Sequence, residues 1–138
     1  MHSNTIPKTV LLKGDPLGQE YPVNAAQTVV PGELVALQTN GTVQRAAAGA
    51  ALVPIMIARE EDYTGGSIDT AYAAGERCPL WHLKPGDEFY GFVTAAVTVG
   101  AGLEAAAAGQ FAPAGTNPRL VQALEATAGA GRCRLRAL

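Results

Sequence analysis

The sequence predicts a mainly β protein, a small sandwich or barrel-like domain of short strands and tight turns, with an extended N-terminal arm and at most one short helix. Short apolar runs alternate with turn signals along the 138 residues, which include 16 glycines and 9 prolines. Apolar residues at helical spacing are not sustained, except over a few residues near position 120. We expect an arm and first strand over residues 1–13, followed by a single β-rich domain over residues 14–138.

The aromatic side chains concentrate in residues 72–92, which we expect to nucleate the core. This stretch holds the only tryptophan, two of the four tyrosines and two of the three phenylalanines. Two apolar runs, residues 80–83 and 89–93, flank the sequence Pro85-Gly86-Asp87. Proline followed by glycine is typical of a tight turn, so the pattern predicts a β-hairpin.

Side chains alternate between the two faces of a strand. Tyr90 and Phe92 should therefore share one face while Phe89 points to the other. At least one large aromatic side chain is then expected outside the main core, and Trp81, Tyr90 and Phe92 could each be a core residue or an interface anchor.

The other segments follow from similar signals. Asn40-Gly41 is the strongest two-residue hairpin signal, and Pro31-Gly32-Glu33 is a second turn of the proline–glycine–acid type. The last residues alternate strictly, which predicts a half-exposed terminal strand in a hairpin with residues 119–126, a segment that fits either a helix turn or a strand. The further expected extended segments are 9–13, 20–23, 34–37, 42–45, 52–58, 96–100 and 102–108.

Composition excludes several classes of function. The net charge is −2 and only 16% of residues are charged, so there is no basic field for nucleic acid and no polybasic patch for a membrane. No window approaches the ~20 apolar residues of a membrane span, and the N-terminus lacks a secretory signal pattern, so we expect a soluble chain made in the cytoplasm. Much of the 48% hydrophobic content is alanine, which predicts a thin core supported by a partner.

The search for reactive groups predicts no catalytic residue, metal or cofactor. His82 could act as a base, but no glycine-flanked Ser or Cys marks a nucleophile. Cys78 and His82 are four residues apart, but Pro79 between them argues against the helix that would bring them together. A disulfide between Cys78 and Cys133 is possible, although two free buried thiols are favoured because two cysteines are too few for a disulfide scaffold.

One segment supports an enzyme alternative. The sequence Gly66-Ser-Ile-Asp-Thr-Ala-Tyr72 is similar to the Gly-x-Ile-Asp-x-x-Tyr motif of trimeric dUTP nucleotidohydrolases. That resemblance implies that Asp69 activates water and that Tyr72 stacks on the sugar. The family's Pro-Arg-Ser-Gly motif and its glycine-rich, arginine-containing C-terminal arm are both absent from this sequence.

A second resemblance extends over most of the chain. The motifs that carry it, in order, are PGELVAL at Pro31, NGTV at Asn40, an alanine-rich spacer before VPIMIARE, IDTAYAAGER at Ile68, LKPGDEFYGFV, VGAGL at Val99, and ALEA followed by RCRLR. In this order and spacing they resemble the head-decoration, or capsid cement, proteins of tailed double-stranded DNA bacteriophages.

This resemblance implies a virion structural protein without catalytic residues or cofactors. It would be made in the bacterial cytoplasm and would bind the exterior of the expanded capsid as a homodimer or homotrimer. Its partners would be the major capsid protein and itself, with no direct nucleic-acid or membrane contact. Repeated binding to the mature lattice would stabilise the shell by mass action. A minor head or tail adaptor is the third possibility.

The candidate capsid or oligomer interface combines aromatic residues, the N-terminal arm and an arginine row. The row could meet acid or phosphate, although charges on an edge strand commonly serve only to prevent edge-to-edge pairing. Residues 1–13 and 132–138 are the candidates for adding a strand to a neighbour's sheet. Tyr90→Ala is expected to weaken association more than monomer stability. The full set is Ile6, Val10, Tyr63, Trp81, His82, Tyr90, Phe92, Arg132, Arg134 and Arg136.

Overall fold

The computed structural model describes residues 9–19, 24–51, 55–61 and 65–138. Regular structure in these residues is almost entirely β, with one 3-10 turn, which confirms the predicted fold class. No helix within the described ranges is long and apolar enough to span a membrane. The elements are β1 (Leu11–Lys13), β2 (Leu17–Gln19), β3 (Val35–Leu37), β4 (Val43–Arg45), β5 (Ile55–Ala58), β6 (Leu80–Leu83), β7 (Glu88–Val93), β8 (Gly102–Ala105), η1 (Ala107–Gly109), β9 (Phe111–Pro113), β10 (Val121–Ala123) and β11 (Gly131–Ala137).

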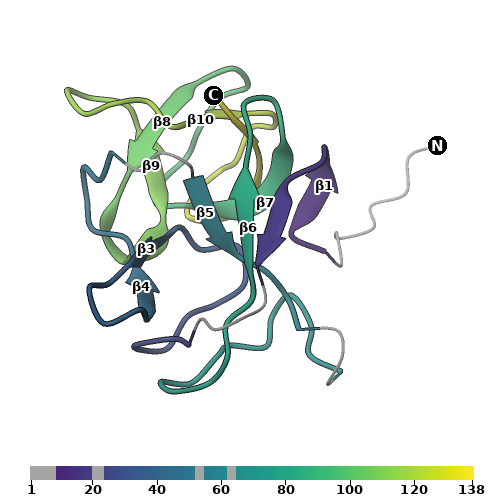
Figure 1. Ribbon diagram of the computed structural model, residues 1–138. Helices are drawn as coiled ribbons and strands as arrows, with labels where there is room; N and C mark the ends of the chain where they lie inside the picture. Colours follow the sequence, from purple (N-terminus) through teal and green to yellow (C-terminus); the bar gives the residue numbers. More distant parts are fainter. Residues whose placement is uncertain (1–8, 20–23, 52–54, 62–64) are drawn as a thin grey trace.

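Five strands form a small barrel. The largest sheet has the order β1-β7-β11-β10-β8-β9, and a parallel contact between β7 and β9 at Val93 and Phe111 closes it (Figure 1). β1 pairs with the beginning of β7, where Leu11 lies opposite Phe89, whereas β9 contacts the end of β7. The arrangement leaves β7 paired with β11 along its whole length.

Alternating side chains of these strands fill the barrel. The Phe89 and Phe111 rings, both fully buried, meet edge to face with centroids 5.9 Å apart. Gly91 faces the same interior, where an added Cβ would lie 2.8 Å from Phe89 Cε2 and 2.9 Å from Leu135 Cδ1. A side chain at this position would overpack the core, so the two large neighbours require glycine. The other buried members include Val10, Val93, Leu103, Val121, Ala123, Cys133 and Ala137.

A second group of strands packs beside the barrel. β6 lies between β2 and β5 in a three-stranded sheet, and β3 and β4 form a separate hairpin. An isolated bridge from Leu34 to Ile57 connects the segment before β3 to β5. This part of the molecule has its own small core, made of Ala25, Val29, Val35, Val43, Ala58, Tyr72, Cys78 and Leu80.

The predicted central hairpin is half right. Both strands exist, as β6 and β7, but they do not pair: β6 joins β2 and β5, whereas β7 joins β1 and β11. The connecting turn changes sheets because its backbone bonds to β11. Gly86 N–H donates to the Ala137 carbonyl at 2.8 Å, and Ala137 N–H donates to the Asp87 carbonyl at 2.9 Å. β7 therefore begins beside β11 instead of folding back on β6.

Two other hairpin predictions are confirmed. β3 and β4 pair around Asn40-Gly41, although three residues lie inside the hydrogen bond from Gln38 N–H to the Thr42 carbonyl. This three-residue loop has Gly41 at φ 86°, a conformation that glycine adopts without strain. β10 and β11 also pair, so residues 121–123 are strand rather than helix.

Other expectations need correction or lie outside the description. β11 is not an edge strand, because it is paired with β7 and β10 on its two sides and cannot add to a neighbour's sheet. Residues 96–100 form no named strand, only a bridge from Val97 to Thr127. The predictions of an N-terminal arm and of extended segments fall partly on residues outside those described, namely 1–8, 20–23 and 52–54.

The two cysteine thiols are free and buried, as predicted. Cys78 belongs to the small core and Cys133 to the barrel core. Burial raises the pKa of Cys78 to about 12, with a contribution from Glu33, and raises that of Cys133 to about 11, with a contribution from Glu125.

The two proline–glycine–acid turns, Val30–Glu33 and Lys84–Asp87, have the same hydrogen bonds. In each, the fourth N–H donates to the first carbonyl, at 3.1 and 3.0 Å, and the third residue is glycine with φ 99° and 96°. The acid's carboxylate then accepts the first residue's N–H, at 2.6 and 2.8 Å. Both acids are buried, and each fixes the backbone where the chain enters a new sheet.

Asp87→Ala should lower the free energy of unfolding by about 1–3 kcal/mol, because the Lys84 and Asp15 N–H groups lose their shared acceptor. Urea unfolding followed by the fluorescence of Trp81 measures this change. Asp15→Ala is the matched control, since Asp15 is exposed and should cost little. Equal stabilities of the two variants would contradict this role of Asp87.

Stability should fall as the pH rises above about 9. Both thiols have raised pKa values in the folded state, so the unfolded chain releases these protons first and the folded state loses its advantage. Each group contributes a loss of up to about 1.4 kcal/mol per pH unit. Urea midpoints at pH 7.5, 9 and 10 under reducing conditions test the slope, which Cys78→Ala should reduce. A flat wild-type profile over this range would contradict the assignment.

Candidate functional site

The predicted interface residues fall into separate groups. Ile6 and Tyr63 lie outside the described residues. Val10 is fully buried in the barrel core, so in the folded chain it is not an interface side chain. Tyr90 and Phe92 share the outer face of β7, as alternation predicted, and the pairing of β7 with β11, which was not predicted, brings Arg132 beside them. The remaining members, Trp81, His82, Arg134 and Arg136, lie elsewhere on β6 and β11.

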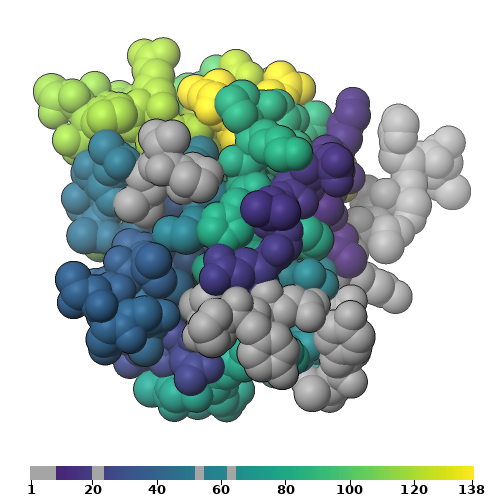
Figure 2. All heavy atoms as spheres, in the orientation of Figure 1, coloured from purple at the N-terminus to yellow at the C-terminus, as the bar shows by residue number. Residues whose placement is uncertain are grey.

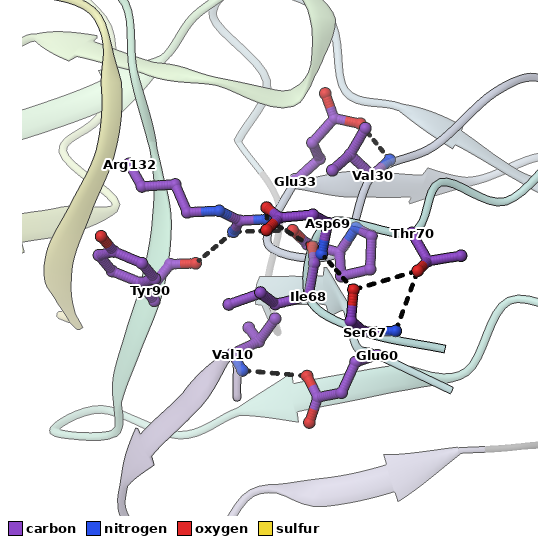
Figure 3. A network of polar contacts seen from close by, with 11 residues as sticks. Val10, Val30, Glu33, Glu60, Ser67, Ile68, Asp69, Thr70, Tyr90 and Arg132 are labelled. Carbon is purple, nitrogen blue, oxygen red and sulfur yellow. Dashed lines mark hydrogen bonds and ion pairs between the residues drawn. The ribbon is translucent and has the colours of Figure 1, made fainter. Parts of the chain in front are cut away.

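Arg132 contacts two aromatic rings and two loops, and Figure 3 shows it beside Tyr90, Ile68 and Asp69. Its guanidinium carbon is 4.3 Å from the Phe92 ring centroid and 5.5 Å from that of Tyr90. Its Nη1 donates to the carbonyls of Pro31 at 3.0 Å and Tyr90 at 3.4 Å. Its Nη2 donates to the Ile68 carbonyl at 2.5 Å. We call these residues, together with Asp69, the Arg132 cluster.

The charge of Arg132 is compensated mainly by backbone. Only 11% of its side chain is exposed, and Asp69, whose side chain is 82% exposed, lies 3.5 Å away. Burial lowers the pKa of Arg132, and the Asp69 carboxylate opposes this shift. Burial also raises the pKa of Tyr90, with a contribution from Glu125. The guanidinium therefore connects β11 to two loops from distant parts of the sequence, a structural task.

The rest of the arginine row pairs with acids of neighbouring strands or turns. Arg134 Nε is 3.9 Å from Glu125 Oε2, and Arg136 Nη2 is 3.6 Å from Glu88 Oε2. Both pairs are partly exposed and contribute little to stability. The row thus faces one way, as predicted, but its three members have different surroundings.

Trp81 and His82 belong to β6, in the second sheet. The Arg59 guanidinium lies 4.5 Å from the Trp81 ring centroid, and the tryptophan packs partly against the barrel core. His82 Nε2 and Gln19 Oε1 are 2.7 Å apart, which joins β6 to β2 by their side chains. These contacts place both residues within the packing between strands.

Three buried carboxylates were not singled out as site residues from the sequence. Glu33, Glu60 and Asp87 are each less than one-tenth exposed. Glu33 also accepts from Arg45 Nε at 3.0 Å, and Glu60 accepts the Val10 N–H at 3.0 Å (Figure 3). The repeated proline–glycine–acid pattern in the sequence could have identified two of them, Glu33 and Asp87. Glu60 lies in the charged sequence Arg59-Glu60-Glu61 directly after β5, yet it is only 7% exposed.

Two residues of the nucleotidohydrolase-like motif, Asp69 and Tyr72, are engaged in contacts within the chain. Tyr72 is 5% exposed, and its hydroxyl donates to the Arg59 carbonyl at 2.5 Å, so its ring is not free to stack on a sugar. Burial raises its pKa. The Asp69 carboxylate points to Arg132 (Figure 3). Among the described residues, no three His, Cys, Asp or Glu side chains gather closely enough to hold a metal ion.

Comparison with known proteins identifies a fold relative. No protein-family model matches the sequence, and no curated protein matches it. Among solved structures, the chain is similar to the N base of the head fiber gp8.5 of bacteriophage phi29. The TM-score is 0.64 at 11% sequence identity, over 88% of this chain and 95% of that chain. The likeness covers nearly the whole of both molecules and shows that they share a fold.

Arg132→Met should lower the free energy of unfolding by about 2–4 kcal/mol, because three carbonyl groups lose their donor in a half-buried site. Chemical denaturation measures the change. Arg134→Met is the control, since an exposed ion pair should contribute about 0–1 kcal/mol. Arg132→Lys keeps the charge but not the planar fork, and should recover only part of the loss. An Arg132→Met variant as stable as wild type would exclude this role.

Proposed function

We propose that the chain is a non-enzymatic structural protein of a bacteriophage virion, which binds the outer surface of the capsid and stabilises the mature shell. The observation that carries the proposal is the fold shared with the base of a phage head fiber over nearly the full length of both chains. The resemblance of the sequence motifs to head-decoration proteins, which was drawn from the residues alone, supports the same assignment.

The chemistry of the described residues is consistent with a binding role. Buried carboxylates accept backbone N–H groups, the thiols are buried with raised pKa values, and Arg132 bonds to carbonyls. Each of these groups is engaged in holding the fold. The proposal therefore assigns the chain no catalytic residue and no cofactor.

We expect the contact surface to include apolar side chains outside the Arg132 cluster. Arg132 and its rings are packed against one another, whereas four large apolar side chains among the described residues are more than half exposed. Such residues can supply apolar contact to a partner, although scattered singly they are common on any protein. They are Leu17, Leu37, Val99 and Leu138. The interface role of Tyr90 stays a prediction, tested by comparing association and unfolding of Tyr90→Ala.

The test is binding to shells of the encoding phage assembled without this chain. After the solution mass of the purified chain is measured, it is mixed with mature shells and sedimented. We expect saturation at a copy number comparable with that of the shell subunits, and a higher temperature of shell disruption, because ligand binding to the intact lattice stabilises it. Immature shells are the control and should bind less.

Two results would count against the proposal. Saturation at a few copies per shell would indicate a minor adaptor instead of a decoration protein. Absence of co-sedimentation at any concentration would overturn capsid binding, and a pyrophosphate-release assay with dUTP would then test the enzyme alternative.

A further inference from the structure

The structure contains an apolar groove where its two sheets meet. The groove has a volume of about 400 Å³ and lies at the ends of β5, β6 and β11. Figure 2 shows this end of the molecule, with the C-terminal residues in yellow beside the green turn after β6. Its floor is formed by side chains of the core that reach the surface, namely Ile55, Leu83, Leu120 and Ala137.

The walls of the groove are exposed and partly apolar. Pro85 lies in the turn after β6, Pro118 precedes β10, and Leu138, which is 52% exposed, follows β11. Leu138 is held in place by its N–H, which donates to the Leu120 carbonyl at 3.0 Å. All the lining residues named here belong to the part of the chain that the structure describes.

Two cations stand at this apolar surface. Lys84 and Arg119 line the groove, both are exposed, and neither forms an ion pair with any residue that the structure describes. The Arg119 side chain lies over the backbone of Gly102, where an added Cβ would be 2.7 Å from its Cδ. The other arginines of the outer face have acidic partners, as Arg134 and Arg136 do. Positive charge is thus left available beside apolar surface.

We infer that this groove binds an extended segment of the shell subunit in which an acidic residue is flanked by aliphatic side chains. The aliphatic groups would occupy the apolar floor, and the carboxylate would meet Lys84 and Arg119. Charge complementarity argues against the chain's own N-terminal arm as occupant, because residues 1–8 contain Lys8 and no acidic residue. The floor also argues against a phosphate backbone, which offers no apolar group to cover it. The inference rests on the proposed function and names the part of the surface that performs it.

The first test compares charge reversals in the shell-binding assay. Arg119→Glu and Lys84→Glu should each weaken binding about tenfold and together more, with a smaller salt dependence of the remaining binding. Arg134→Glu is the matched control, because it reverses an exposed arginine outside the groove, and it should change binding less than about twofold. Arg119→Lys should restore most of the affinity. Thermal unfolding of each variant separates loss of binding from loss of folding.

The outcomes distinguish the groove from the proposed function. Failure of the wild-type chain to bind shells overturns capsid binding itself. Binding by wild type that the groove reversals leave unchanged, or that Arg134→Glu weakens equally, overturns the groove alone.

The second test identifies the occupant. p-Benzoylphenylalanine introduced at Leu138 is photo-crosslinked on decorated shells, and the crosslinked peptide is sequenced by mass spectrometry. A segment of the major shell subunit containing Asp or Glu beside aliphatic residues is expected. A crosslink to another copy of this chain, or to a segment without an acidic residue, would overturn the inference.

Discussion

The buried guanidinium of Arg132 is the interaction on which the arrangement of the loops depends. β11 and β7 would form a sheet without it, but the loops at Pro31 and Ile68 are held to that sheet through their carbonyls by this one side chain. A partly buried cation of this kind is stable only when its donors are satisfied, which three carbonyls and Asp69 achieve. The same contacts stack the two aromatic rings of the outer face on the arginine, which makes them part of the fold.

Buried carboxylates stabilise the backbone between the sheets by accepting hydrogen bonds from N–H groups. A chain of many short strands has to change direction often, and each change leaves backbone N–H groups without ladder partners. Glu33 and Asp87 accept such groups in the turns that lead into a new sheet, and Glu60 accepts the N–H of Val10 just before β1. The barrel and the smaller sheet are therefore joined by polar contacts as well as by the apolar side chains at their junction. That junction also leaves the groove between the ends of β5, β6 and β11.

The candidate site was predicted in part. Alternation within each strand predicted that Tyr90 and Phe92 share one face and that Arg132 belongs to a row facing one way, since that period is a local property of strands. The pairing of β7 with β11, which brings the two sets together, was not predicted. Their packing against one another was not predictable, because it depends on loops that lie 64 and 101 residues away from Arg132 in the sequence. The groove was missed for the same reason. Its lining comes from residues that are far apart in the sequence, namely Ala51, Ile55, residues 83–85, residues 118–120 and residues 137–138.

The sequence by itself determined the all-β class, the turns at Asn40 and at the two proline–glycine–acid sites, and the strictly alternating last strand. These features follow from local backbone preference and side-chain period, which act over a few residues. The tertiary structure decided which strands pair. β6 and β7 look like a hairpin, yet hydrogen bonds from their connecting turn to Ala137 direct β7 to β11 instead. Strand partners far apart in sequence are selected by the packing of the whole core, and local patterns do not specify that choice.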